Sequence, residues 1–114
     1  MTRTIFTPRL RRMKRSVKEI IRQRRSQMLV HSYLYYRLDQ PIIDDDTWQK
    51  WANELAELQR ENPNDCNINF YDKHFEDWNG DTGFHLPLYD VKVARKAEQI
   101  LNIYKEKNES EKPV

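Results

Sequence analysis

Apolar residues recur at every third or fourth position along two segments in the first half of the chain. The first stripe predicts a helix over about 13–39, and its members are Met13, Val17, Ile20, Ile21, Met28, His31, Tyr35 and Leu38. Proline disfavours the helical conformation at the residue before it, so this helix should end before Pro41. Its length exceeds that of an average helix, which leaves room for a break or bend at about 22–27.

The second stripe predicts a helix over about 45–61, with an apolar face formed by Trp48, Trp51, Ala52, Leu55 and Leu58. Asp44 or Asp45 can accept hydrogen bonds from backbone N–H groups at its start, and the Asn62-Pro63 pair ends it. Two helices joined by a short loop form an antiparallel hairpin. We expect its shared core to contain Tyr35, Leu38, Trp48, Trp51 and Leu55.

Residues 64–88 differ from both helices because Asn, Asp, Gly and Pro are frequent there. Six apolar anchors interrupt this polar stretch, namely Phe70, Tyr71, Phe75, Trp78, Phe84 and Leu86. We expect an ordered loop pinned by aromatic side chains, with room for one short strand pair. Asp77–Gly83 offers oxygen ligands at alternate positions, as a calcium loop does, but Thr82 and Leu88 stand at its sixth and twelfth positions. A tight turn is therefore favoured over a calcium site.

A third helix is predicted over about 90–107, where the apolar positions are Val93, Ala94, Ala97, Ile100, Leu101 and Tyr104. The expected fold class is mainly α, an antiparallel helical hairpin plus an aromatic-pinned loop and a C-terminal third helix. We assign 13–107 to a single helical domain, 1–12 to a flexible basic N-terminus and 108–114 to a mobile tail.

Composition narrows the class of protein further. A chain of 114 residues suits one small domain, and two glycines are too few for a hairpin-rich β fold. The single cysteine, Cys66, cannot form an internal disulfide, and three scattered histidines do not give a metal-ligand spacing. No apolar run approaches the roughly 18 residues that cross a bilayer. We expect a soluble, cytoplasmic protein that contacts no membrane.

The net charge of +2 hides a strong asymmetry. Residues 1–25 contain ten Lys and Arg against one acidic residue, and the rest of the chain is acidic. Six of these bases recur at three and four residues and form a predicted basic patch, Arg11, Lys14, Arg15, Lys18, Arg22 and Arg25. Such a patch can bind DNA or RNA phosphates or an acidic protein surface, or it is simply a solvated helix face.

The hairpin region also contains a distinctive series of residues. The stretch from His31 to Asp45 reads His-Ser-Tyr-Leu-Tyr-Tyr-Arg-Leu-Asp-Gln-Pro-Ile-Ile-Asp-Asp, and Trp48, the Glu54–Leu58 helix segment and Pro63 follow it. Over about 25–63 this series resembles the N-terminal two-helix subdomain (Ia) of bacterial NAD-dependent DNA ligases. Short ligase-related proteins of bacteriophages are similar in size and layout, so we expect a phage or mobile-element protein.

The resemblance implies a site for the nicotinamide mononucleotide half of NAD, formed by aromatic rings and carboxylates where the two helices meet. Its implied nucleotide-binding residues are Tyr35, Tyr36, Asp45 and Trp48. Trp48 stands where the family has tyrosine, and Gln49 stands where it has aspartate, so the implied affinity for NAD or nicotinamide mononucleotide is weak and no cofactor is bound tightly. The alternative is structural: Tyr35, Trp48 and Trp51 belong to the core, and Asp45 is a helix cap.

Motifs for catalysis are missing from the sequence. A ligase needs a lysine nucleophile in a Lys-x-Asp-Gly setting, and neither this motif, a nucleophile elbow nor a glycine-rich phosphate loop occurs. We therefore expect no enzyme but a non-catalytic binding module that acts in nucleotide or DNA transactions. Two alternatives remain open: an adaptor or inhibitor of a host or phage protein, and a nucleic-acid-binding protein that uses the arginine-rich first helix.

Overall fold

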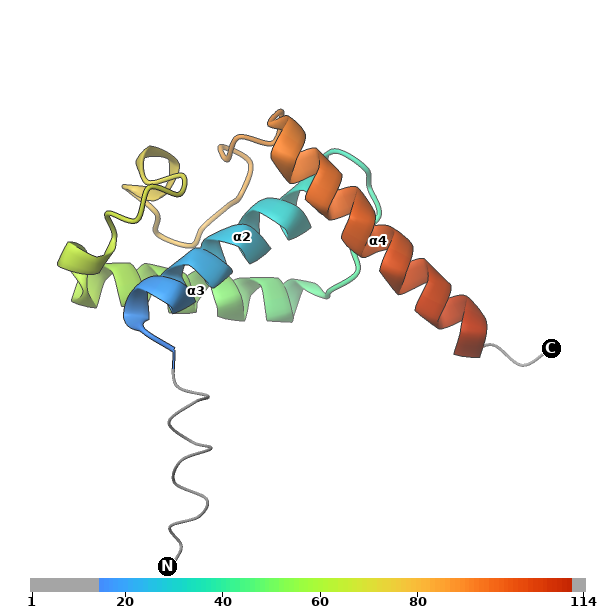
Figure 1. Cartoon of the computed structure of the whole chain (residues 1–114), viewed down its shortest axis with the longest axis horizontal. Coiled ribbons are helices and arrows are strands. Elements are labelled where there is room, and N and C mark those ends of the chain that lie inside the picture. Colours follow the sequence, from blue (N-terminus) through green and yellow to red (C-terminus); the bar gives the residue numbers. More distant parts are fainter. Residues whose placement is uncertain (1–14, 112–114) are drawn as a thin grey trace, which may run out of the picture.

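The computed structural model describes residues 15–111 of the chain. In chain order their elements are α2 (Val17–Tyr36), α3 (Asp45–Glu61), the short 3-10 helices η1 (Pro63–Asp65) and η2 (Lys73–Phe75), and α4 (Val91–Glu111) (Figure 1). No strand occurs among the described residues. The expected fold class, mainly α, is confirmed, and the short strand pair considered within 64–88 does not form.

Helix α2 begins with a capping box. The Ser16 side chain accepts a hydrogen bond from the backbone N–H of Glu19 (3.1 Å), and the Glu19 carboxylate accepts one from the backbone N–H of Ser16 (2.8 Å). The helix then continues from Val17 to Tyr36, so the break considered at 22–27 is absent. The predicted start at residue 13 lies outside the described residues.

Helix α2 ends at Tyr36, a few residues before the predicted end. The cause is Asp39, which adopts a left-handed conformation with φ 55° and so reverses the chain. The backbone N–H of Gln40 then donates to Leu34 O over 2.8 Å and satisfies a carbonyl of the last turn. Pro41 follows this cap and does not itself stop the helix.

Helix α3 has the predicted bounds. Asp44 is its N-cap, since its Oδ1 accepts a hydrogen bond from Thr47 N (2.8 Å), and at the other end Asn62 N donates to Leu58 O (3.0 Å). Helices α2 and α3 run in opposite directions and pack against each other (Figure 1). The predicted antiparallel hairpin is therefore confirmed.

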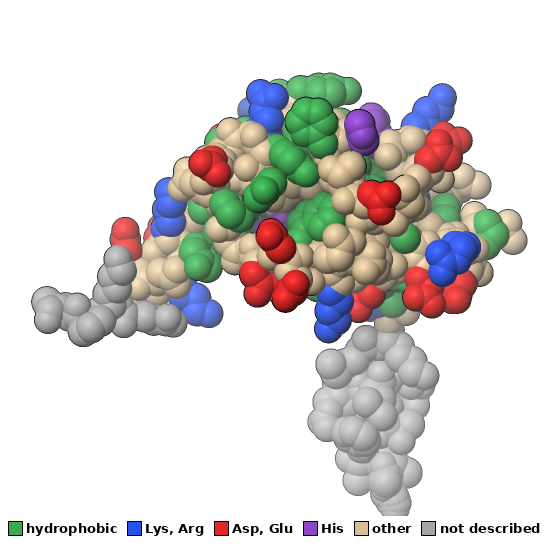
Figure 2. Space-filling view, turned by 180° about the vertical axis from the view of Figure 1, so that it is seen from behind, with side chains coloured by type: hydrophobic (Ala, Val, Ile, Leu, Met, Phe, Trp, Pro, Cys, Tyr) green, Lys and Arg blue, Asp and Glu red, His purple; other side chains and the backbone are tan. Residues whose placement is uncertain are grey.

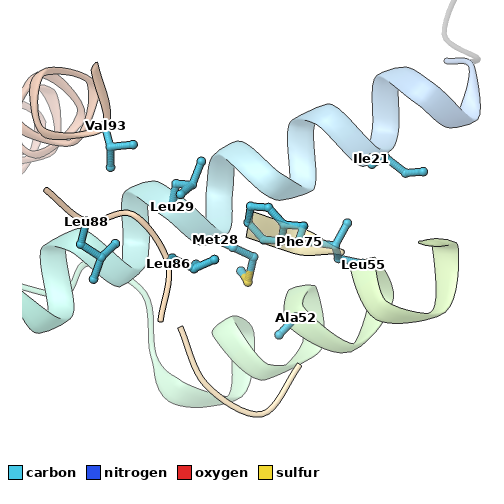
Figure 3. Close-up of a cluster of buried hydrophobic side chains, with 9 residues drawn as sticks. All are labelled: Ile21, Met28, Leu29, Ala52, Leu55, Phe75, Leu86, Leu88 and Val93. Atoms are coloured by element: carbon cyan, nitrogen blue, oxygen red, sulfur yellow. The ribbon is translucent and has the colours of Figure 1, made fainter. Parts of the chain in front are cut away.

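The main core lies between α2, α3 and the segments that follow α3 (Figure 3). Its buried members are Ile21, Met28, Leu29, Ala52, Leu55, Phe75, Leu86, Leu88 and Val93. Leu55 was predicted in the core and is fully buried. Leu38, Trp48 and Trp51 are only half-buried and lie at the edges of the packed regions.

Helix α2 has a second buried face, which its single predicted apolar stripe did not indicate. Here Val30 and Leu34 pack against α4 residues Ala97 and Leu101. Tyr35 belongs to neither face and is 49% exposed, so its prediction as a core residue is wrong. Its ring instead meets that of Tyr36 edge to face at 4.8 Å.

The loop between α3 and α4 is held by aromatic side chains, as predicted. Phe75 is fully buried, and the other inward rings are Phe70, Tyr71 and Trp78. Trp78 Nε1 donates a hydrogen bond to Ala52 O in α3 over 3.0 Å. Phe84 is 66% exposed, so its prediction as an anchor is wrong. Its ring packs instead against the Tyr36 ring at a centroid distance of 5.4 Å.

Arg25 connects α2 to this loop from inside the protein. Its side chain is 1% exposed. The guanidinium donates from Nε to Gln59 Oε1 (2.8 Å), from one terminal nitrogen to Phe70 O (2.8 Å) and Asp72 Oδ1 (2.7 Å), and from the other to Cys66 O (3.0 Å). Arg25 was predicted in the basic patch, and this prediction is wrong because the side chain shares the buried face of α2.

Helix α4 is capped by Asp90, whose Oδ1 accepts a hydrogen bond from Lys92 N (2.8 Å). The Tyr71 hydroxyl donates to the other carboxylate oxygen (2.9 Å), and burial together with this acidic neighbour raises the pKa of Tyr71 to about 12. The helix continues to Glu111, so the part of the expected tail at 108–111 is helical. Its second half projects away from α2 and α3 (Figure 1). None of the described helices is both long and apolar enough to span a bilayer.

Candidate functional site

The end of α2, the hairpin loop and the start of α3 surround a pocket of about 310 Å³. All four residues predicted for nucleotide binding line it: Tyr35, Tyr36, Asp45 and Trp48. Figure 2 shows the face opposite to that of Figure 1, where hydrophobic side chains lie beside a group of acidic ones. The fold thus brings together residues that the sequence distributes over two helices.

The two tyrosines stand at the rim of the pocket. Tyr35 and Tyr36 are 49% and 39% exposed, and their rings meet edge to face at 4.8 Å. Exposed aromatic rings at a pocket offer faces on which a planar ligand can stack. Trp48 lies deeper and is fixed in orientation, since its Nε1 donates to Ser32 Oγ (3.3 Å) and its ring meets that of Trp78 at 6.2 Å.

Two aspartates at the start of α3 have different roles in this pocket. Asp44 is occupied as the helix cap, and the hydrogen bonds from Thr47 hold the pKa of its carboxyl below the ordinary value. Asp45 also lines the pocket but is exposed, and its carboxylate makes no hydrogen bond within the described part of the chain. The structural alternative for Asp45 as the cap is therefore wrong, and its carboxylate faces the pocket without a protein partner.

A segment far away in the sequence forms the other wall. Asp81 and Thr82 line the pocket, and the Tyr36 hydroxyl lies 3.1 Å from Thr82 Oγ1. Gln49 Nε2 donates to Gly80 O over 2.8 Å, which ties this segment to α3. The sequence pattern did not indicate a nucleotide-binding role for residues 64–88, and the glycines that flank Asp81 and Thr82 are the signal that was missed.

His31 forms part of the floor and was considered as a core residue. Its ring packs against that of Trp51 at 5.6 Å, and its buried Nδ1 has no hydrogen-bond partner among residues 15–111. Burial lowers the pKa of His31 below its ordinary value of 6.5. The imidazole is therefore neutral near pH 7 and adds no positive charge to the pocket.

Acidification should destabilise the protein through His31. Its pKa is lower in the folded than in the unfolded chain, so the stability that the neutral ring contributes is complete above about pH 6.5 and is lost as the pH falls below that value. Urea unfolding at about pH 7.5 and about pH 5.5 should show a larger loss of stability for the wild type than for His31→Gln. His85→Gln, at an exposed histidine, is the control. Equal losses in wild type and His31→Gln would contradict this assignment.

The predicted basic patch is only partly present as an exposed surface. Arg11 and Lys14 lie outside the described residues, and Arg15, Lys18 and Arg22 are exposed around the start of α2. The Arg22 guanidinium lies 4.0 Å above the Phe70 ring. With Arg25 buried, the exposed stripe of the described chain ends at Arg22.

Metal ligands do not come together in the described part of the chain. Between residues 15 and 111 no group of three or more His, Cys, Asp or Glu is arranged to hold an ion. The stretch considered as a calcium loop instead forms turns, in which Gly80 has φ 85° and Asn79 Oδ1 accepts a hydrogen bond from Asp81 N (2.9 Å).

Comparison with known proteins identifies the hairpin. A family model described as the DNA ligase-like, N-terminal NAD+-binding domain matches residues 14–69. No curated protein and no solved structure matches the chain. The matched stretch covers α2, α3 and η1 but ends before Asp81, Thr82 and α4. Residues 14–69 of this chain, which contain the α2–α3 hairpin, are therefore similar to the DNA ligase-like, N-terminal NAD+-binding domain.

Proposed function

We propose that the junction pocket binds the nicotinamide nucleoside part of NAD or of nicotinamide mononucleotide, and that the chain is a non-catalytic binding module in nucleotide or DNA transactions. One observation supports this most: the residues implied by the family resemblance, Tyr35, Tyr36, Asp45 and Trp48, all line one pocket.

The chemistry of the pocket suits this ligand. The oxidised nicotinamide ring is aromatic and positively charged, and such rings bind well between aromatic faces and carboxylates. Among the described residues, Asp44, Asp45 and Asp81 line the pocket, and no Lys or Arg does. A volume of about 310 Å³ is small for a ligand pocket and favours one nucleoside over a whole dinucleotide.

Two features argue that the binding is weak. At position 49 the side chain is an amide that is already bonded to Gly80 O, so it offers the ligand no charge. Trp48 provides a ring without the hydroxyl that the family has there, and its Nε1 is bonded to Ser32. The ligand therefore relies on the rings and on the aspartates.

The proposal of a non-catalytic module follows from the sequence. The chain contains no Lys-x-Asp-Gly motif, and the family that it matches is an N-terminal binding domain of ligase-like proteins. Binding without nucleotidyl transfer suits a protein that senses or presents a nucleotide to a partner.

Substitution of Asp45 tests the proposal directly. Wild-type protein should bind nicotinamide mononucleotide with saturation in the millimolar range, as measured by amide chemical shifts. Asp45→Ala should weaken binding up to about fivefold, enough to remove saturation, because it deletes a partly exposed charge opposite the ring.

Asp46→Ala is the matched control, since Asp46 is exposed in the same first turn of α3 but does not line the pocket. It should leave binding unchanged. Equal weakening by both substitutions would mean that only the general acidity of the helix start matters. No spectral change at several millimolar nucleotide would remove the proposal altogether.

A further inference from the structure

The segment 79–84 lies outside the family match, yet it completes the pocket. It is fastened to the hairpin by Gln49 Nε2, which donates to Gly80 O (2.8 Å), and by the contact of the Tyr36 hydroxyl with Thr82 Oγ1 (3.1 Å). Just before it, Trp78 Nε1 donates to Ala52 O (3.0 Å). These contacts attach the segment to both helices.

Glycines let the segment approach the helices closely. A Cβ at Gly80 would lie 3.2 Å from Ala52 O, and one at Gly83 would overlap Ser32 Oγ and come within 3.2 Å of the Trp48 ring. Both glycines are buried. The segment is therefore seated on the hairpin as a packed wall, and Asp81 is positioned between its two points of closest approach.

The segment 79–84 adds one negative charge to the two that the hairpin already places at the pocket. Asp44 and Asp45 line the pocket from the start of α3, and Asp81 adds a third carboxylate from the segment 79–84. Asp81 is exposed, and its carboxylate accepts no hydrogen bond among the described residues. A ring held in the pocket therefore has acidic groups nearby from both α3 and the segment 79–84.

We propose that Asp81 is a specificity-determining residue of this pocket, which makes it select a cationic nicotinamide nucleoside over the neutral, reduced form. This inference rests on the proposed function for the identity of the ring. It adds Asp81, which lies in the segment outside the family match, and a preference for the cationic ring over the neutral one. A phosphate gains nothing in a pocket with three carboxylates and no Lys or Arg among the described lining residues.

The test compares nicotinamide riboside, a cation without a phosphate, with its reduced form, which has a neutral ring of nearly the same size. Wild-type protein should bind the oxidised riboside about three- to fivefold more tightly. Asp81→Asn keeps the shape of the side chain and should lower this ratio to about half or less, because only the carboxylates at the start of α3 then remain in the pocket. Asp77→Asn is the matched control, because Asp77 is exposed in the same loop and does not line the pocket.

A second measurement monitors the amide resonances of the segment 79–84. Ring stacking in the pocket shifts nearby amide resonances, so the Gly80 and Thr82 amides should move when riboside is added to the wild type. In Asp81→Asn the oxidised form should move them less at the same concentration. Shifts confined to α2 and α3 would overturn the inference, since the segment would then not face the ligand.

The outcomes separate the two proposals. If Asp45→Ala weakens binding while Asp81→Asn keeps the wild-type ratio, the role of Asp81 is overturned and the proposed function stands. If Asp81→Asn lowers the ratio measured for the riboside but nicotinamide mononucleotide does not bind, the role of Asp81 is supported and the mononucleotide is removed from the proposed function. If neither compound binds, both proposals are wrong.

Discussion

Replacement of Arg25 with methionine should destabilise the fold by about 2–4 kcal/mol. Methionine fills similar space but cannot donate hydrogen bonds, so the carbonyl groups of Cys66 and Phe70 lose the guanidinium donor and the carboxylate of Asp72 keeps only its backbone donors. Each buried polar group left without a partner costs about 1–3 kcal/mol. Asp72 is about one-third exposed, which keeps the total below that of a fully buried pair. Urea unfolding monitored by tryptophan fluorescence measures the change.

Two further variants test whether the hydrogen-bond geometry of Arg25, and not its charge alone, stabilises the fold. Arg22→Met removes an exposed arginine close by in α2 and should cost far less. Arg25→Lys keeps the charge but should restore only part of the stability, because one ammonium cannot reach acceptors on all sides of a planar guanidinium. If Arg25→Met and Arg22→Met unfold at the same urea concentration, the described burial of Arg25 is wrong.

The contrast between the two arginines shows what a charge pattern can predict. The spacing of bases along the first helix places Arg22 and Arg25 in one patch, yet Arg25 is buried and Arg22 is not. Arg25 also stands four residues after Ile21 and three before Met28, which are both fully buried. The apolar stripe therefore indicated that Arg25 is buried. The prediction was wrong because arginine side chains are usually exposed.

Helix ends were predictable where the local signals agreed. At α3 an aspartate cap, an apolar face and Asn62-Pro63 all indicate the same bounds, and the structure has them. At the end of α2 the visible signal was Pro41, whereas the helix ends earlier through the left-handed Asp39. An Asp in that conformation is uncommon, and nothing in the neighbouring sequence distinguishes it from other polar residues.

The pocket was predictable only for the half that lies within the helical hairpin. Tyr35, Tyr36, Asp45 and Trp48 are neighbours through the hairpin, and a resemblance restricted to that segment could find them. Asp81 reaches the same pocket through a loop whose course depends on packing between distant residues. Periodicity gives no information about such a loop, because it has neither a helical nor a strand repeat.

Substitution of Gly83 with alanine should remove this second half of the pocket. The new methyl group would overlap Ser32 Oγ and lie 3.0 Å from Ser32 Cβ and 3.2 Å from Trp48 Cζ2, so the segment must move outward at a cost of about 1–3 kcal/mol. The displacement also takes Asp81 away from the junction. Selectivity for oxidised nicotinamide riboside should therefore fall together with stability, which titration and urea unfolding measure separately.

A double-mutant cycle with Ser32→Ala identifies the cause. Alone, Ser32→Ala should cost about 0.5–1.5 kcal/mol, because Trp48 Nε1 loses its acceptor. Combined with Gly83→Ala it removes the overlapping oxygen and makes room for the methyl group, so the double variant should be more stable than the sum of the two single losses implies. Strictly additive losses would show that Gly83 does not approach Ser32, and the packed wall that holds Asp81 at the pocket would then be wrong.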